Sequence, residues 1–248
     1  MSNNDYPRII LMTCDKSDYL IPGYAHLLRK YWQPTPDVLV CGFRTPPDLC
    51  GFDFYSIGDF ADYPIDKWSD AFLKVLNHIP DEVFIFMLED YWLYRHVDAQ
   101  AIKMLYDYMH QFTNVLKIDL CADRLGAQGG QPFVQDANTY AHLDRLDLIQ
   151  SLPGWDYHMS LWGGMFRRDL LKKLIVPSEA AQEIEIEGTR RLSADHKDML
   201  VLGTRQVPLR HGNILRGGDK SHQYMGTGGQ MWMREVDLKE MREMGLIE

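Results

Sequence analysis

Two adjacent carboxylates, Glu89 and Asp90, directly follow an apolar run from Val83 to Leu88. The run is too short for a buried helix, and its continuous apolar character is typical of a strand covered on both faces. Carboxylates at the carboxyl end of such a strand face the crevice in which open α/β sheets bind ligands. Their hard oxygen atoms suit Mg²⁺ or Mn²⁺ bridging a diphosphate. An acidic turn without function is an equally good interpretation of this stretch alone.

Basic and glycine-rich segments later in the chain could bind the phosphates that such a metal would bridge. Gly212, Asn213, Gly217 and Gly218 surround His211, and these residues permit close backbone approach to a phosphate. A lone histidine is nevertheless more often an ordinary surface or core residue. The guanidinium forks of arginine match phosphate oxygens, so we expect Arg124 and Arg216, together with Lys220, to bind the diphosphate.

The elements that must position these residues alternate between strand and helix patterns. Strands are predicted at Arg8–Met12, Asp37–Cys41, Phe52–Ile57, Val83–Leu88 and Val115–Leu120, and helices at Tyr24–Trp32, Ile65–Ile79 and Asp98–Phe112. This order predicts a mostly parallel sheet covered by helices. A polar, glycine-containing loop is expected over 124–138. Order then returns with 157–162 and with helices over 166–175 and 178–192.

The bulk properties indicate an ordinary α/β globular protein. With 248 residues, 46% hydrophobic and 25% charged, the chain can bury one core, and we expect a single domain over 1–248. The net charge of −9 argues against general nucleic-acid affinity, although residues 166–220 carry a local basic excess. No leader or membrane-spanning run is evident, so we expect a cytoplasmic protein. The four widely spaced cysteines suggest buried thiols rather than zinc ligands or disulfides.

Several short segments, taken in order, resemble small nucleotide-sugar glycosyltransferases of the GT-A type, and most closely the compact bacterial and phage enzymes. The resemblance runs from about residue 8 to residue 220 and rests on Thr13-Cys14-Asp15, the helix with Trp68, Glu89-Asp90-Tyr91, a strand over 157–162 leading into 166–171, the run 179–185, and His211-Gly212-Asn213 with Arg216-Gly217-Gly218. It implies a GT-A-like, Rossmann-like sheet. Residues 1–120 would form the nucleotide-binding half, and 121–248 the acceptor and diphosphate-binding half.

The resemblance also implies roles for individual residues. Glu89-Asp90 corresponds to the DxD-type motif, so Asp90 would bind the metal and Glu89 the ribose or the metal's waters. Tyr91 stands where a third acid is usual, which leaves a metal site completed elsewhere or a metal-independent enzyme. His211 would add a metal or diphosphate contact. Thr13 and Asp15 would contact the base or ribose, although the same sequence would also form a turn that caps the next helix.

The resemblance places the general base in the run from Glu179 to Glu187. This run is similar to a Glu-x-x-Trp-x-x-Glu segment with Gln182 in place of the aromatic residue, and its final glutamate is Glu185. We expect Glu185 to be the base and Asp156 to be the next candidate. Glu183 and Glu187 are predicted to form surface ion pairs at helical spacing with Arg190 and Arg191.

The predicted activity is the transfer of a sugar from a nucleotide-diphosphate sugar, such as a UDP-sugar, to an acceptor hydroxyl. It would be assisted by Mn²⁺ or Mg²⁺ and would invert the anomeric centre. The acceptor would be a glycan or a hydroxymethylated base in phage-type DNA. One alternative is a non-catalytic nucleotide-binding or scaffold protein of the same fold. Another is a nucleotidyltransferase, although no glycine-rich phosphate loop follows the first strand. The oligomeric state is not predicted.

Overall fold

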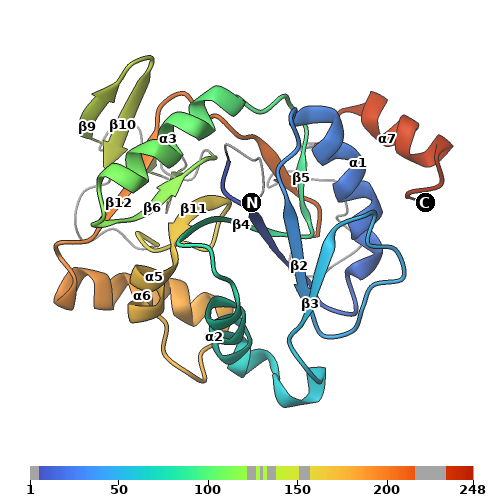
Figure 1. The fold of residues 1–248 in the computed structure, drawn as a ribbon, viewed down its shortest axis with the longest axis horizontal. Helices are drawn as coiled ribbons and strands as arrows, with labels where there is room; N and C mark the ends of the chain where they lie inside the picture. The colour runs from blue at the N-terminus through green and yellow to red at the C-terminus, as the bar shows by residue number, and fades with distance from the viewer. Residues whose placement is uncertain are drawn as a thin grey trace.

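The structure is a computed structural model, and it describes residues 6–121, 127–128, 131–132, 138–150, 157–215 and 233–247. Within these ranges, one sheet of nine strands runs through the molecule in the order β3-β2-β1-β4-β11-β6-β12-β10-β9 (Figure 1). Its strands are β1 Ile9–Met12, β2 Val38–Gly42, β3 Asp53–Ser56, β4 Val83–Leu88, β6 Val115–Asp119, β9 Asn138–Leu143, β10 Leu146–Gln150, β11 Gly164–Arg167 and β12 Leu200–Thr204. Strands β10 and β11 run opposite to the others, so the predicted mostly parallel sheet is confirmed.

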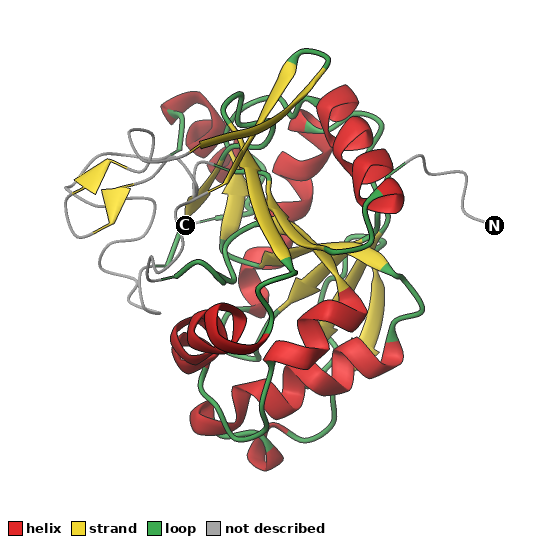
Figure 2. Cartoon of the chain, turned by 90° about the vertical axis from the view of Figure 1, so that its left-hand side faces the viewer, coloured by secondary structure: helices red, strands yellow, loops and turns green. Residues whose placement is uncertain are grey.

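Helices cover both faces of this sheet (Figures 1 and 2). Helices α1 and α3 lie on one face, whereas α2, α5 and α6 lie on the other, and α7 lies beside α1. Their bounds are α1 Ile21–Tyr31, α2 Trp68–His78, α3 Ala99–Gln111, α5 Arg168–Leu174, α6 Ala181–Asp195 and α7 Glu235–Glu243. Short 3-10 helices cover Asp18–Leu20, Phe60–Asp62 and Ile65–Lys67. No helix in the described ranges is long and apolar enough to cross a bilayer.

Successive side chains of the central strands point to opposite faces of the sheet, so the buried side chains form two cores. Ile9 and Leu11 of β1 join the core beneath α1 and α3, whereas Ile10 and Met12 join the core beneath α2, α5 and α6. Strand β4 divides its side chains in the same way, because successive residues of a strand point to opposite faces. All four cysteines are free thiols, and the prediction that they are buried is confirmed for Cys41 and Cys121 but not for Cys14 and Cys50, which are half-buried. The carboxyl ends of β1, β4 and β6 therefore emerge together between two packed layers.

Two smaller pairings lie outside the large sheet. Strand β5 (Tyr91–Leu93) pairs antiparallel with β13 (His211–Asn213), immediately after the end of β4. Strand β7 (Ala127–Gln128) pairs with β8 (Gln131–Pro132). Neither pairing was predicted from the sequence, nor were the β9–β10 hairpin, β12 and helix α7.

The segment 157–162, predicted as a strand, has no regular secondary structure. The strand begins later, at Gly164, and the helix that follows begins at Arg168 rather than Phe166. The physical reason is that β11 inserts antiparallel between β4 and β6, whereas residues 159–161 are bonded by side chains from other elements. The last predicted helix, 178–192, runs over Ala181–Asp195, because the Glu183 carboxylate caps it by accepting the Ala180 N–H at 2.8 Å.

Candidate functional site

The carboxyl ends of the neighbouring parallel strands β1 and β4 carry three buried polar side chains. Thr13 follows β1, and Glu89 and Asp90 follow β4, with exposed fractions of 7%, 8% and 9%. The Glu89 N–H donates to the Met12 carbonyl at 3.3 Å, which continues the ladder past the end of both strands. This edge of the sheet therefore has the placement that the sequence predicted for Glu89 and Asp90, but with both carboxylates more enclosed than a solvated turn would leave them.

Glu89 connects the loop after β4 to the loop after β1. Its carboxylate accepts hydrogen bonds from the Ser17 hydroxyl and the Cys14 backbone N–H. Burial, together with the neighbouring charge of Asp90, raises the pKa of Glu89 to about 8, and these two hydrogen bonds and one from the Glu89 backbone oppose part of this rise. Ser17 was not predicted as a site residue. Glu89 therefore organises the loop that carries Thr13 and Asp15.

Asp90 is a buried carboxylate with spare acceptor capacity. The Leu215 N–H donates to it, while its Oδ1 atom has no hydrogen-bond partner among the described residues. Burial raises the pKa of Asp90 to about 7. Buried carboxylate oxygens normally have hydrogen-bond partners. A buried carboxylate at a strand end that lacks one among the described residues is suited to bind a cation or a hydrogen-bond donor of a ligand.

The β5–β13 ladder brings His211 next to this edge. His211 is 5% exposed, and its ring stacks on Tyr91 with centroids 4.5 Å apart and an interplanar angle of 16°. The ring of Trp162 lies 5.4 Å from His211 and 5.6 Å from Tyr91. Tyr91 stands where the resemblance expects a third acid. Together with Trp162 it forms an aromatic wall against which His211 packs.

The described residues contain no group of three or more His, Cys, Asp or Glu side chains placed to hold a metal ion. Asp90 and His211 therefore do not make a complete protein ligand set within this part of the chain. Magnesium and manganese sites that bind nucleotides commonly use only one or two carboxylates, with phosphate oxygens and waters supplying the remaining ligands. The chemistry of Asp90 fits that kind of site.

A turn follows Thr13, as one interpretation predicted, but no side chain caps the start of Asp18–Leu20 or of α1. The Ser17 N–H donates to the Cys14 carbonyl at 3.0 Å, and Thr13 Oγ1 donates to the same carbonyl at 3.4 Å. Asp15 also accepts the Arg44 backbone N–H at 3.2 Å, which ties the loop after β1 to the loop after β2. Both residues lie at the sheet edge where nucleotide contacts were predicted.

Glu185 points from α6 toward the irregular segment after residue 157. Its Oε1 atom accepts the Leu161 N–H at 2.6 Å, and its side chain is half-buried. Leu161 immediately precedes Trp162, so the hydrogen bond links Glu185 to the aromatic wall. Of the three glutamates considered on this helix, Glu185 is the one that reaches the segment beside the candidate site.

The predicted surface pairs on α6 are partly wrong. Glu187 does pair with Arg190. Arg191, however, pairs with Glu179 at 2.7 and 2.9 Å, because its side chain turns toward the Leu174 carbonyl at the end of α5. Glu183 is occupied by the helix cap. Four predicted site residues lie outside the described residues: Asp156, Arg124, Arg216 and Lys220.

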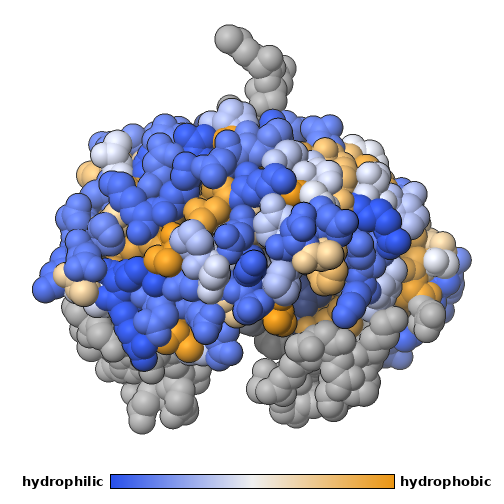
Figure 3. Space-filling view, turned by 90° about the horizontal axis from the view of Figure 1, so that it is seen from below, coloured by the Kyte–Doolittle hydropathy of each residue, from blue (hydrophilic) through white to orange (hydrophobic). Residues whose placement is uncertain are grey.

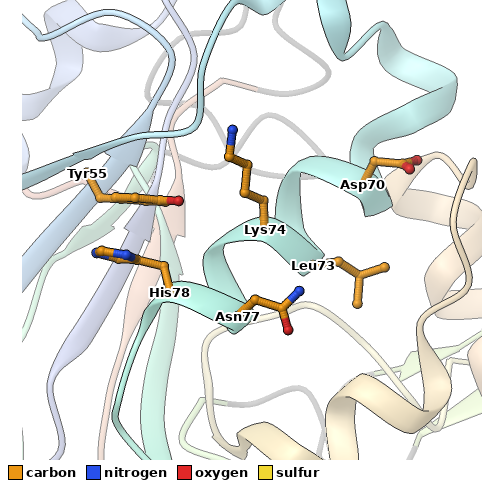
Figure 4. Close-up of a pocket in the computed structure, with 6 residues that line it drawn as sticks. All are labelled: Tyr55, Asp70, Leu73, Lys74, Asn77 and His78. Atoms are coloured by element: carbon orange, nitrogen blue, oxygen red, sulfur yellow. The ribbon is translucent and has the colours of Figure 1, made fainter.

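A hollow lies along the outer side of α2 (Figure 4). It is shallow and is lined by Tyr55, Asp70, Leu73, Lys74, Asn77 and His78. Tyr55 and His78 stack with centroids 3.6 Å apart, so two of its aromatic groups already satisfy one another. The surrounding face, seen in Figure 3, is mostly hydrophilic with small, separate apolar patches. None of the predicted site residues lines this hollow.

No protein-family model and no curated protein matches the chain. Similar solved structures include a mannosyltransferase from Pyrobaculum calidifontis in complex with GDP-mannose and Mn²⁺, at 14% identity over 86% of this chain and 58% of that one, with a TM-score of 0.49. Residues 1–349 of Staphylococcus aureus TarS give 12% identity over 80% and 57%, with a TM-score of 0.47. CMP-2-keto-3-deoxy-manno-octonic acid synthetase complexed with CTP gives 12% over 79% and 88%, with a TM-score of 0.44.

The similar structures thus include a mannosyltransferase in complex with a nucleotide sugar and a synthetase in complex with a nucleotide. The chain spans less than two thirds of the mannosyltransferase and TarS chains. At these identities and TM-scores, the likeness concerns the arrangement of strands and helices. The reaction of this chain has to be argued from its own residues.

Proposed function

We propose that this protein is a cytoplasmic glycosyltransferase that moves a sugar from a nucleotide-diphosphate sugar to an acceptor hydroxyl. The observation that carries the proposal is the buried Asp90 carboxylate at the edge shared by β1 and β4, one oxygen of which has no hydrogen-bond partner among the described residues. Thr13 and Asp15 lie at the same edge and are the proposed contacts to the base or ribose. Glu89 positions their loop, and its carboxylate is proposed to face the ribose side of the donor.

A divalent metal fits this site as a partner of the donor's diphosphate. Asp90 would hold Mn²⁺ or Mg²⁺, and the bound ion would stabilise the negative charge of the departing nucleoside diphosphate. His211, beside Tyr91 and Trp162, is proposed to contact the diphosphate or the metal. Arg124, Arg216 and Lys220 remain proposed diphosphate contacts on the basis of their charge.

Glu185 is the proposed general base, with Asp156 as the next candidate. An inverting transfer needs one carboxylate that takes the acceptor hydroxyl's proton as that hydroxyl attacks the anomeric carbon. The Leu161 N–H donates to one oxygen of Glu185 and so orients the carboxylate toward the segment beside the candidate site. We propose that the acceptor is a glycan or a hydroxymethylated base in DNA.

The proposal is tested by thermal unfolding of the wild-type chain with a panel of nucleotide-diphosphate sugars, with and without Mn²⁺. A ligand that binds only the folded chain raises its stability by mass action, so at least one donor should raise the Tm, and Mn²⁺ should increase the shift. Asp90→Asn should abolish the Mn²⁺ increment. Glu82→Gln is the matched control, because Glu82 lies just before the opposite end of β4 and pairs there with Arg167.

Each alternative function has its own outcome in this experiment. A shift with nucleoside triphosphates but with no diphosphate sugar would favour a nucleotidyltransferase. A donor shift without any transfer to glycans or to hydroxymethylated DNA would favour a nucleotide-binding scaffold. An undiminished Mn²⁺ increment in Asp90→Asn would remove Asp90 from the metal site.

A further inference from the structure

An ion pair that has no place in the site described so far lies inside the sheet. Lys117 and Asp119 of β6 pair with one another, and both side chains are 0% exposed. They are two residues apart on a strand, so they share one face. That face is the one covered by α2, α5 and α6, because Lys117 Nζ lies 5.1 Å from the centroid of Phe166, which belongs to that core.

Lys117 binds the irregular segment that approaches the candidate site. Its ammonium group donates to the Ser160 carbonyl at 2.8 Å and to the Ser160 hydroxyl at 2.7 Å. Together with Asp119, these contacts match the three N–H donors of a lysine. The sheet therefore holds Ser160 through one fully buried charge.

Helix α6 holds the two neighbours of Ser160 from the other side. The Met159 N–H donates to Thr189 Oγ1 at 2.9 Å, and the Leu161 N–H donates to Glu185 Oε1 at 2.6 Å. Residues 159–161 have no strand ladder. Three consecutive residues are thus fixed by side chains that come from β6 and α6.

The two glycines that follow connect the same segment to His211. A Cβ atom on Gly164 would lie 2.7 Å from Lys117 Cε, and one on Gly163 would lie 2.9 Å from His211 Nε2. Trp162, just before them, packs against His211. A displacement of Ser160 would therefore shift the contacts of Glu185 on one side and of His211 on the other.

Burying an ion pair is seldom the most stable solution for a sheet interior. Desolvation offsets most of the attraction, and apolar side chains of similar volume are often as stable or more so. Such a pair can instead select one arrangement among several. The arrangement selected here is the course of residues 159–164.

We propose that Lys117 is a positioning residue for the candidate site. By fixing Ser160, it sets the path of residues 159–164 and so the placement of the Glu185 carboxylate and of Trp162 against His211. The catalytic meaning of this placement rests on the proposed glycosyl transfer. The placement itself is independent of the reaction.

The test compares Lys117→Met with the double variant Lys117→Met/Asp119→Asn. The single variant removes the ammonium group from beside the buried Asp119 carboxylate and should lower the Tm, whereas the double variant removes both charges and should recover much of it. Arg167→Met is the matched control. It removes a buried charge from the far end of β11, where Arg167 bonds the Val115 carbonyl rather than Ser160.

Two readouts separate positioning from stability. The first is the amide NMR resonance of Leu161, which should move in both Lys117 variants, including the double variant with recovered Tm, and should stay in place in Arg167→Met. The second is transfer. In the double variant, kcat should fall by about 10²-fold, the usual effect of a displacement near 1 Å, while donor affinity measured by calorimetry is unchanged.

A double variant with the wild-type Leu161 resonance and wild-type kcat would overturn the inference and leave Lys117 a purely structural residue. If the double variant does not fold, Ser160→Ala supplies the decision, because it keeps the ion pair and removes one of the two contacts. It should shift the Leu161 resonance in the same direction, and an unmoved resonance would overturn the proposal. If the wild-type chain binds no donor, the proposed function fails while the resonance still decides the role of Lys117.

Discussion

At the scale of single residues, the candidate site depends on two adjacent carboxylates that differ in how they are satisfied. Glu89 accepts bonds from Ser17 and Cys14, whereas Asp90 keeps one oxygen without a partner among the described residues. The sequence predicted the position of both at the end of β4. It did not predict their burial, because enclosure comes from Leu215 and from the loop after β1, which are distant in sequence.

The raised pKa values of this pair predict how stability depends on pH. An acid whose pKa is higher in the folded than in the unfolded chain binds more protons when folded, so its contribution to stability is fully present below the unfolded pKa. The contribution of Glu89 and Asp90 to the free energy of unfolding is therefore present near pH 4 and is lost as the pH rises toward 7 to 8. Without metal, the Tm should fall between pH 5 and 8.5, and Asp90→Asn should flatten that fall by at least about 2–4 °C, the effect of roughly 1 kcal/mol in a chain of this size.

The same pH series with Mn²⁺ and a donor provides the control. Because protons compete with a metal for a carboxylate, the Mn²⁺ increment should grow as pH rises. A Tm profile in Asp90→Asn that parallels the wild-type profile would show that the pH dependence arises elsewhere in the molecule.

The three glutamates of α6 predict a sharp contrast in transfer. Glu185→Gln keeps an oxygen for the Leu161 N–H, so it should fold and bind donor normally while transfer falls by roughly 10²–10⁴-fold. Glu187→Gln should change stability by only about 0.3–0.5 kcal/mol, the value of an exposed helical pair. Glu183→Gln should also be mild, since glutamine can cap a helix.

Single-turnover assays of the three variants check this contrast. A large loss in Glu183→Gln or Glu187→Gln, with Glu185→Gln near wild type, would place the base elsewhere on the helix. Full activity in all three would direct the search to Asp156.

At the scale of elements, long apolar patterns were predictable and short ones were not. The first five predicted strands and the helices α1 to α3 match the structure to within a few residues, because their apolar spacing follows the strand and helix periods. The three-residue strands β5 and β13 carry no such period and exist because they pair with each other. Residues 159–161 are bonded by the side chains of Lys117, Thr189 and Glu185, which are distant in sequence or on another element, so local pattern could not reveal their course.

The contact between α1 and β5 predicts the effect of a methyl group in the core. A Cβ atom on Gly23 of α1 would lie 2.4 Å from the Trp92 ring, whose Nε1 donates to the Glu89 carbonyl at 3.0 Å. Gly23→Ala should lower the free energy of unfolding by about 1–3 kcal/mol through overpacking, despite the better helix propensity of alanine. Urea unfolding checks this value, with Ser193→Ala on the exposed side of α6 as the control. A gain in stability for Gly23→Ala would mean that Trp92 is free to move.

At the scale of the whole molecule, the predicted fold class holds because the parallel strands and their covering helices alternate along the chain. The sheet is broader than predicted, since β9, β10 and β12 extend it past β6. Two strands run against the rest, and β11 is placed between β4 and β6 by contacts that no short segment of sequence encodes.

The overall charge predicts how a DNA acceptor would be recognised. With a net charge of −9, the chain should not retain unmodified duplex DNA at physiological salt, because nonspecific affinity depends on neutralising phosphates. If a hydroxymethylated base is the acceptor, transfer should require that base and should be lost on the same duplex without it. Gel-shift and transfer assays on the matched duplexes measure both quantities. Retention of plain duplex would contradict the charge argument.

The β5–β13 ladder also sets an order of events during synthesis. Strands β1 to β4 can pair as soon as they leave the ribosome. The other edge of β4 can pair only after β11 has been synthesised, and Tyr91 of β5 can pack against His211 only after β13 has been synthesised. Contacts between distant parts of a chain form late. A nascent chain would therefore hold a half-built sheet, with the Glu89–Asp90 edge uncovered, until its last third is translated, so the enclosure of these carboxylates would be among the final steps of maturation.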